Sequence, residues 1–193
     1  MKHEKGFSLF EMLIVIGIIA LLVLSTIPAL SLIHSVSLSN EVDRVAGELK
    51  KARQQAISEN RTLEIRLYSY RGNRSDETKI IRSIQTWERT DAGNFTPVTP
   101  LQKLAAPVVI SEDPAITQIG PSLNPSEPTE EAQLPSGATY RAFRFRPAGT
   151  TNLDLSEEWF FTMHLEGQTG TPPPNFATFV IEPLTGAAQV LRP

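Results

Sequence analysis

Glu11 is the residue whose position most clearly implies chemistry, because it is the only acid in a long apolar segment. Residues 7–33 contain no other Asp or Glu, and from Met12 to Asn40 there is no Asp, Glu, Lys or Arg. A helix of about 20 residues spans the ~30 Å hydrocarbon core of a bilayer. Residues 7–33 are therefore long enough to form a transmembrane helix with a carboxylate near its beginning.

Such a segment has three interpretations. A cleaved signal peptide would have small residues before its cut, and Ala29-Leu30-Ser31 fits this loosely. A plain membrane anchor is the second interpretation, and a short leader that is removed before the apolar run is the third. A carboxylate near the centre of a membrane helix costs about 2.5–3.5 kcal/mol, and less near an end. A signal peptide or a plain anchor gains nothing in return, so Glu11 favours the third interpretation.

Cleavage after Gly6 would give Glu11 a partner. It would expose the amine of Phe7, four residues before the acid. Opposite charges about 4 Å apart attract by about 4 kcal/mol at an effective dielectric of ~20. In a bundle of such helices, Glu11 of a new subunit would pair with the amine of its neighbour and thereby set the register.

The segment Gly6-Phe7-Ser8-Leu9-Phe10-Glu11 and the apolar run after it resemble the type IV prepilin cleavage and methylation motif. The resemblance implies a leader at residues 1–6 that a prepilin peptidase removes by cutting after Gly6. It also implies N-methylation of Phe7 and an assembly role for Glu11. Pro28 lies where these proteins often carry a helix-kinking proline, and the alternative is that Pro28 ends the first helix.

The rest of the chain predicts an α+β fold, in which a long N-terminal helix packs on a C-terminal antiparallel sheet. We expect an amphipathic continuation of the helix over residues 34–59 and a β-rich head over residues 60–193, with a long loop at 112–137. The apolar stripe expected on the helix comprises Val42, Val45, Leu49, Ala52, Ala56 and Ile57. Strands are predicted at 62–71, 80–89, 107–111, 140–146, 159–166, 176–182 and 188–191.

Three blocks of the head carry a closer resemblance. Residues 60–68, 143–151 and 175–186 are similar to the Verru_Chthon cassette protein D family, which carries prepilin motifs. The strand order, with a phenylalanine-rich strand running into Pro-x-Gly, also loosely resembles minor pseudopilins of type II secretion of the H or FimT type. Both resemblances imply a helical stalk with a strand-rich head.

Composition gives little support to other function classes. The net charge is −3 without a dense basic block, so no nucleic-acid partner is indicated, and there is no cysteine. We expect no metal site and no cofactor: the histidines are far apart, and Asp154, Glu157 and Glu158 are expected to form a solvated loop. Arg141, Arg144 and Arg146 are expected on one exposed sheet face. His164 is expected to be structural, and the core is expected to include Trp87, Trp159, Phe160 and Phe161.

The sequence therefore predicts a structural subunit, a minor pilin or pseudopilin of a type IV pilus-like or type II secretion-like filament, and not an enzyme. Its expected partners are prepilin peptidase, other pilin subunits and the inner membrane. Lys2 and Lys5 would stay on the cytoplasmic side of a single-pass protein whose head is periplasmic, or extracellular in a filament. The alternative is a membrane-anchored periplasmic binding domain or enzyme with no filament role.

Overall fold

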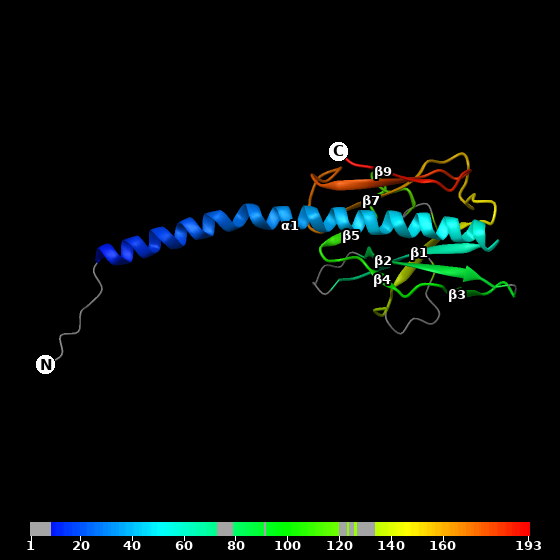
Figure 1. Cartoon of the computed structure of the whole chain (residues 1–193), viewed down its shortest axis with the longest axis horizontal. Coiled ribbons are helices and arrows are strands. Elements are labelled where there is room, and N and C mark those ends of the chain that lie inside the picture. Colours follow the sequence, from blue (N-terminus) through cyan, green and yellow to red (C-terminus); the bar gives the residue numbers. More distant parts are fainter. Residues whose placement is uncertain (1–8, 73–78, 91, 120–122, 124–125, 127–133) are drawn as a thin grey trace. The chain divides into compact units, whose positions relative to one another are not determined.

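The computed structural model describes residues 9–72, 79–90, 92–119, 123, 126 and 134–193, without the side chains of residues 23–34. The described part contains one α-helix, α1 (Leu9–Ser58), and nine strands (Figure 1). The chain divides into two compact units, Met1–Val36 and Ser37–Pro193. The strands are β1 (Leu63–Tyr70), β2 (Ile80–Arg89), β3 (Phe95–Pro97), β4 (Gln102–Lys103), β5 (Val108–Ile110), β6 (Thr139–Phe145), β7 (Trp159–Leu165), β8 (Phe176–Ile181) and β9 (Ala188–Leu191).

The strands form one antiparallel sheet in the order β6-β1-β2-β5-β7-β8-β9, with β3 and β4 also paired to β2. The α+β prediction is confirmed, and each of the seven predicted strands is present within a residue or two of its expected ends. β3 and β4 were not predicted. They have three and two residues, which is too short for an alternating pattern, and β3 contains Pro97.

Within the second unit, the C-terminal part of α1 lies on one face of the sheet and buries its apolar stripe there (Figure 1). Five of the six predicted stripe residues are fully or almost fully buried, namely Val42, Val45, Leu49, Ala52 and Ala56. Ile57 is the exception, because it is 44% exposed. It lies one residue beyond Ala56, about 100° around the helix and away from the stripe. Its Cδ1 atom reaches the turn at Gly149 instead of the sheet.

The face of the sheet turned toward α1 carries the expected apolar residues. Leu63, Ile65 and Leu67 of β1 are buried in the same cluster as the helix stripe, together with Phe143 and Phe145 of β6. Farther along the sheet, the rings of Phe161 and Phe179 stack at 4.7 Å between β7 and β8. The main core therefore lies between the sheet and α1.

The opposite face of the sheet is also covered. Tyr68 and Tyr70 form a second apolar cluster with Ala138, and Leu101, Leu134 and Tyr140 pack against it. Buried Trp87 lies on the same face, because it pairs with Glu64 across β1 and β2. This second layer explains why every residue of β1 is buried, although the strand alternates between apolar and charged residues.

The prediction that Arg141, Arg144 and Arg146 share one exposed face was wrong. Arg141 pairs with Leu67 in the β1–β6 register, so it lies on the helix side of the sheet, where it forms an ion pair with Glu112 at 2.7 Å. Arg144 lies on the opposite face, since residues three apart in a strand point to opposite sides. Arg146 is exposed, as expected.

The aromatic residues predicted on β7 differ in how deeply they are buried. Trp159 and Phe161 are buried, whereas Phe160 and His164 are half-buried. The imidazole Nδ1 of His164 lies 2.9 Å from the carbonyl oxygen of Leu165, which fits the structural role expected for it. Much of the predicted loop 112–137 lies outside the described residues. Its described beginning is held to the sheet through the buried residues Thr117 and Ile119.

Candidate processing and assembly segment

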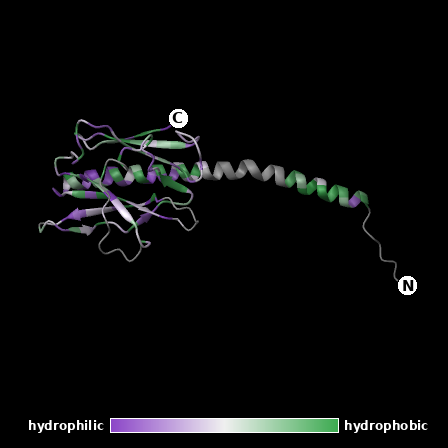
Figure 2. Cartoon of the chain, turned by 180° about the vertical axis from the view of Figure 1, so that it is seen from behind, coloured by the Kyte–Doolittle hydropathy of each residue, from purple (hydrophilic) through white to green (hydrophobic). Residues whose placement is uncertain are grey.

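The described N-terminal part of α1 is apolar on all sides. All residues from 9 to 22 are exposed, and eleven of them are large hydrophobic residues (Figure 2). These are Leu9, Phe10, Met12, Leu13, Ile14, Val15, Ile16, Ile18, Ile19, Leu21 and Leu22. A helix that is hydrophobic all round is normally buried in a membrane or among other helices. This surface is therefore the part of the chain that most needs a partner or a lipid environment.

Glu11 lies in the first turn of α1, within this apolar surface, and it is exposed. A carboxylate in a first helical turn interacts favourably with the positive end of the helix dipole. Once the apolar surface is covered, the carboxylate would lie in a medium of low dielectric, where its attraction to a cation becomes much stronger. The geometry thus makes Glu11 the one charged group of the described residues 9–22.

The structure describes only one of the other predicted site residues, Pro28. Gly6 and Phe7 lie outside the described residues, so cleavage and methylation there stay predictions. Pro28 lies inside α1, which continues to Ser58, so the helix does not end at this proline. The kink itself stays a prediction. No helix is long and apolar enough to cross a membrane within the part of the chain that the structure describes.

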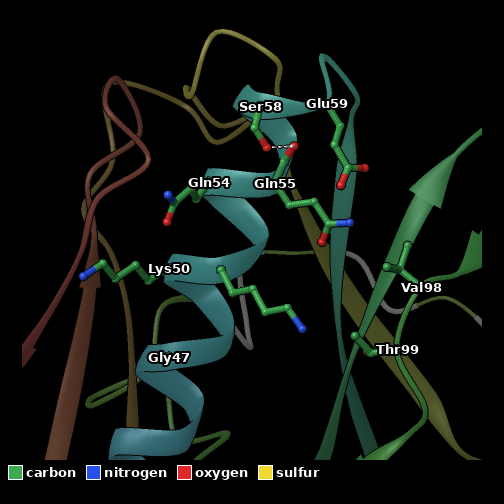
Figure 3. A pocket seen from close by; sticks show the side chains of 9 residues that line it. Gly47, Lys50, Gln54, Gln55, Ser58, Glu59, Val98 and Thr99 are labelled. Carbon is green, nitrogen blue, oxygen red and sulfur yellow. Dashed lines mark hydrogen bonds between the residues drawn. The ribbon is translucent and has the colours of Figure 1, made fainter.

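A second surface of interest is a groove between α1 and the segment that joins β3 to β4 (Figure 3). Its volume is about 600 Å³, and Gln55 of α1 projects toward Val98, whereas Lys50 and Gln54 point to the other side of the helix. Val98 and Thr99 line the other side. The full lining is Gly47, Lys50, Lys51, Gln54, Gln55, Ser58, Glu59, Val98 and Thr99. This set holds no histidine and no pair of close carboxylates of the kind that general acid–base catalysis uses.

The acidic loop named from the sequence is solvated. Asp154, Glu157 and Glu158 are exposed, and an Asp154 carboxylate oxygen accepts hydrogen bonds from the backbone N–H and the hydroxyl of Ser156 at 2.9 and 2.8 Å. The backbone bond, with help from the hydroxyl, lowers the pKa of Asp154. Among the residues described, no group of three or more His, Cys, Asp or Glu side chains is placed to hold a metal ion.

A buried charge network lies on the face of the sheet opposite α1, and the sequence did not predict it. Glu64 accepts a hydrogen bond from Arg66 Nε on one carboxylate oxygen and from Arg144 Nε on the other, each at 2.7 Å. Glu64 is 2% and Arg66 6% exposed. Burial tends to lower the pKa of Arg66, but its hydrogen bond to Glu64 and the charge of that carboxylate raise it above the ordinary value.

Comparison with known protein families gives a match at the N-terminus. Residues 1–27 match the family model described as the prokaryotic N-terminal methylation motif. The N-terminus of this chain carries that motif. The match covers the segment that contains Gly6, Phe7 and Glu11, and it agrees with the prepilin resemblance drawn from those residues. The resemblance to the Verru_Chthon cassette protein D family is not confirmed and stays a prediction.

Two solved structures match this chain over most of its length. The type IV minor pilin FimU of Pseudomonas aeruginosa (strain PAO1) is 15% identical, with 80% of this chain and 87% of that chain covered at a TM-score of 0.48. The minor pseudopilin EpsH from the type 2 secretion system of Vibrio cholerae is 10% identical, with 83% and 97% covered at a TM-score of 0.46. No curated protein matches the chain.

Proposed function

We propose that this chain is a minor pilin or pseudopilin, a structural subunit of a type IV pilus-like or type II secretion-like filament. The observation that carries the proposal is the helical surface of residues 9–22, which is apolar on every side, contains Glu11 and lies within the matched methylation motif. Such a surface is stable only when lipid or other helices cover it. A subunit that moves from a membrane into a filament meets both conditions in turn.

The processing step follows from the motif. A prepilin peptidase cuts after Gly6, and the new N-terminus at Phe7 is methylated. The leader contains Lys2, Glu4 and Lys5, so the net charge of the chain changes from −3 to −4 on its removal. The two lysines hold the leader on the cytoplasmic side, and residues 60–193 lie in the periplasm.

Assembly then depends on the apolar helix and its carboxylate. When the helix leaves lipid for a bundle of similar helices, the hydrophobic driving force changes little, because lipid tails are as apolar as leucine. Close packing and the pairing of Glu11 with the amine of a neighbouring Phe7 would therefore decide which register forms. The chain needs no catalytic residues for this role.

Two measurements test the proposal. Mass spectrometry of the mature protein should find Phe7 as the first residue, with a mass increase for one methyl group. An intact Met1, or a start near Leu32, would contradict the processing step. Glu11→Ala should abolish or strongly reduce incorporation into filaments while the protein still reaches the membrane. Asp43→Ala is the matched control, because Asp43 is an exposed acid whose ion pair is with Arg192 of the same chain.

Because the sequence contains no cysteine, disulfide cross-linking through introduced cysteines provides an independent test of helix packing. Single cysteines introduced for Leu13 or Ile16 can form disulfides only with another subunit. If the apolar surface packs against other copies, oxidation should yield covalent dimers of the wild-type helix and far fewer in the Glu11→Ala background. Equal cross-linking in both backgrounds would contradict the role of Glu11 in assembly. No cross-linking in either background would support the alternative, a membrane-anchored binding domain or enzyme without a filament role.

A further inference from the structure

The charge network of Glu64, Arg66 and Arg144 lies on a face of the sheet that α1 does not cover. The β1–β2 and β1–β6 registers place Glu64 between Trp87 on one side and Arg144 on the other. Arg66 lies on the same face because it is two residues farther along β1. Phe95 of β3 closes the group at the edge, and its ring lies near both guanidinium groups.

The network carries an excess of positive charge. One carboxylate is shared by two guanidinium groups, so the three side chains have a net charge of +1. Arg89 pairs with Phe95 across β2 and β3, and alternation along β2 puts it on the face of Trp87. Arg89 is exposed and adds a further positive charge beside the network. A buried or half-buried positive excess is costly unless an anion offsets it.

The two arginines also have unused hydrogen-bond donors. A guanidinium has five N–H donors, and in both residues only the Nε–H is bonded to a described side chain. Around Arg66, the Cζ atom lies 3.9 Å from the centre of the Trp87 ring and 4.4 Å from that of Tyr140. Aromatic rings stabilise the cation through their π faces but leave its Nη groups without a full acceptor.

We propose that Arg66 and Arg144 form a docking site for the side-chain carboxylate of an acidic peptide segment from another protein chain. The planar guanidinium edge matches the two oxygens of a carboxylate, and such paired bonds are among the strongest in proteins. A carboxylate would neutralise the excess charge and use the open Nη donors. The rings of Phe95 and Trp87 would contact the aliphatic part of the incoming side chain.

The low exposure of the Arg66 side chain favours a peptide over a nucleic acid. The side chain of Arg66 is 8% exposed, whereas that of Arg144 is 40% exposed. A single carboxylate on a flexible glutamate or aspartate stem can reach side chains that are exposed to this extent. A phosphate backbone is instead held by several cations along an open surface.

The test uses the full chain in detergent micelles and three labelled probes: a short glutamate-rich peptide, the same peptide with glutamines, and a short oligothymidine. We expect the glutamate peptide to bind, and Arg144→Gln to weaken it by about tenfold or more, since a hydrogen bond to a charged group contributes about 1.5–3 kcal/mol. Arg66→Lys keeps the charge but loses the planar edge, so it should also weaken binding. Arg192→Gln is the control, because Arg192 pairs with Asp43 away from this face.

Circular dichroism and thermal unfolding of each variant show whether it is folded before binding is compared. Equal affinity for the glutamate and glutamine peptides, or an Arg144→Gln variant that binds like the wild type, would overturn the proposal. Stronger binding of oligothymidine would overturn it in favour of a nucleic-acid surface. None of these outcomes depends on processing or on Glu11, so the proposed filament role stands or falls separately.

Discussion

Replacing Glu64 by glutamine should destabilise the folded second unit far more than the same change at a half-buried glutamate. The amide oxygen can still accept a hydrogen bond from one arginine, but the amide NH₂ group then faces the Nε–H of the other. Breaking a buried ion pair by removing one partner costs about 3–5 kcal/mol, because a charge stays buried without compensation. Arg144 is half-exposed and contributes at most about 1 kcal/mol of this. We therefore expect a loss of about 3 kcal/mol, which arises mostly from Arg66.

Thermal unfolding of the full chain in detergent, followed by tryptophan fluorescence, measures this loss. One kcal/mol shifts the midpoint of a domain of 150–250 residues by roughly 2–4 °C, so Glu64→Gln should lower it by about 6–12 °C. Glu88→Gln is the matched control, because Glu88 pairs with the exposed Arg61 and should cost at most about 1 kcal/mol.

A double replacement tests whether the loss of stability comes from leaving the charge of Arg66 buried without a partner. If the loss comes from leaving Arg66 buried without its partner, Glu64→Leu combined with Arg66→Leu should cost less than Glu64→Gln alone. Should Glu64→Gln lower the midpoint no more than Glu88→Gln does, the network would contribute little and the reasoning from burial would be refuted.

Three further results are expected. Phe179→Ala should destabilise the protein by about 3–5 kcal/mol in urea unfolding, because it removes a fully buried ring stacked on Phe161. Gly186→Ala should cost more than ~1 kcal/mol in the same assay, since Gly186 has a φ of +66° and an added Cβ would lie 2.3 Å from the carbonyl oxygen of Gly149. In an NMR titration, Ser156→Ala should raise the pKa of Asp154, because the hydroxyl helps to lower it. The stabilisation from Asp154 is present above the pKa of the unfolded chain and is lost as pH falls through the lowered pKa of the folded state, so acid should reduce the difference in stability between the two proteins.

The sequence predicted the elements of the fold well wherever periodicity carries the information. The apolar stripe on α1 and the alternation of Leu63, Ile65 and Leu67 were predicted from spacing alone, and the structure confirms both. The prediction was wrong for Ile57, which is exposed because it lies near the end of the helix and points away from the sheet. β3 and β4 were missed because so few residues have no detectable period.

The charge network could not be found from one strand at a time. In sequence, Glu64 and Arg66 look like the solvent-facing half of an alternating strand, and only the register with Trp87 and Arg144 shows that they are enclosed. The wrong placement of Arg141 has a different cause, because its spacing from Arg144 within one strand was overlooked. A sequence signal did exist: the interval of three residues between these arginines places them on opposite sides of a strand.

Glu11 and Glu64 show two ways in which a protein can use a carboxylate in apolar surroundings. The carboxylate of Glu64 accepts hydrogen bonds from two arginines within the second unit. Its contribution to stability is therefore complete once the sheet has folded. Glu11 lies in a helical surface that is apolar on every side, and under the proposed function that surface is covered only when lipid or neighbouring subunits surround it. The same low dielectric that makes a mispaired carboxylate costly then strengthens its attraction to the amine of the next subunit. A mutation at Glu64 should therefore change the stability of the isolated subunit, whereas a mutation at Glu11 should leave that stability unchanged and alter assembly.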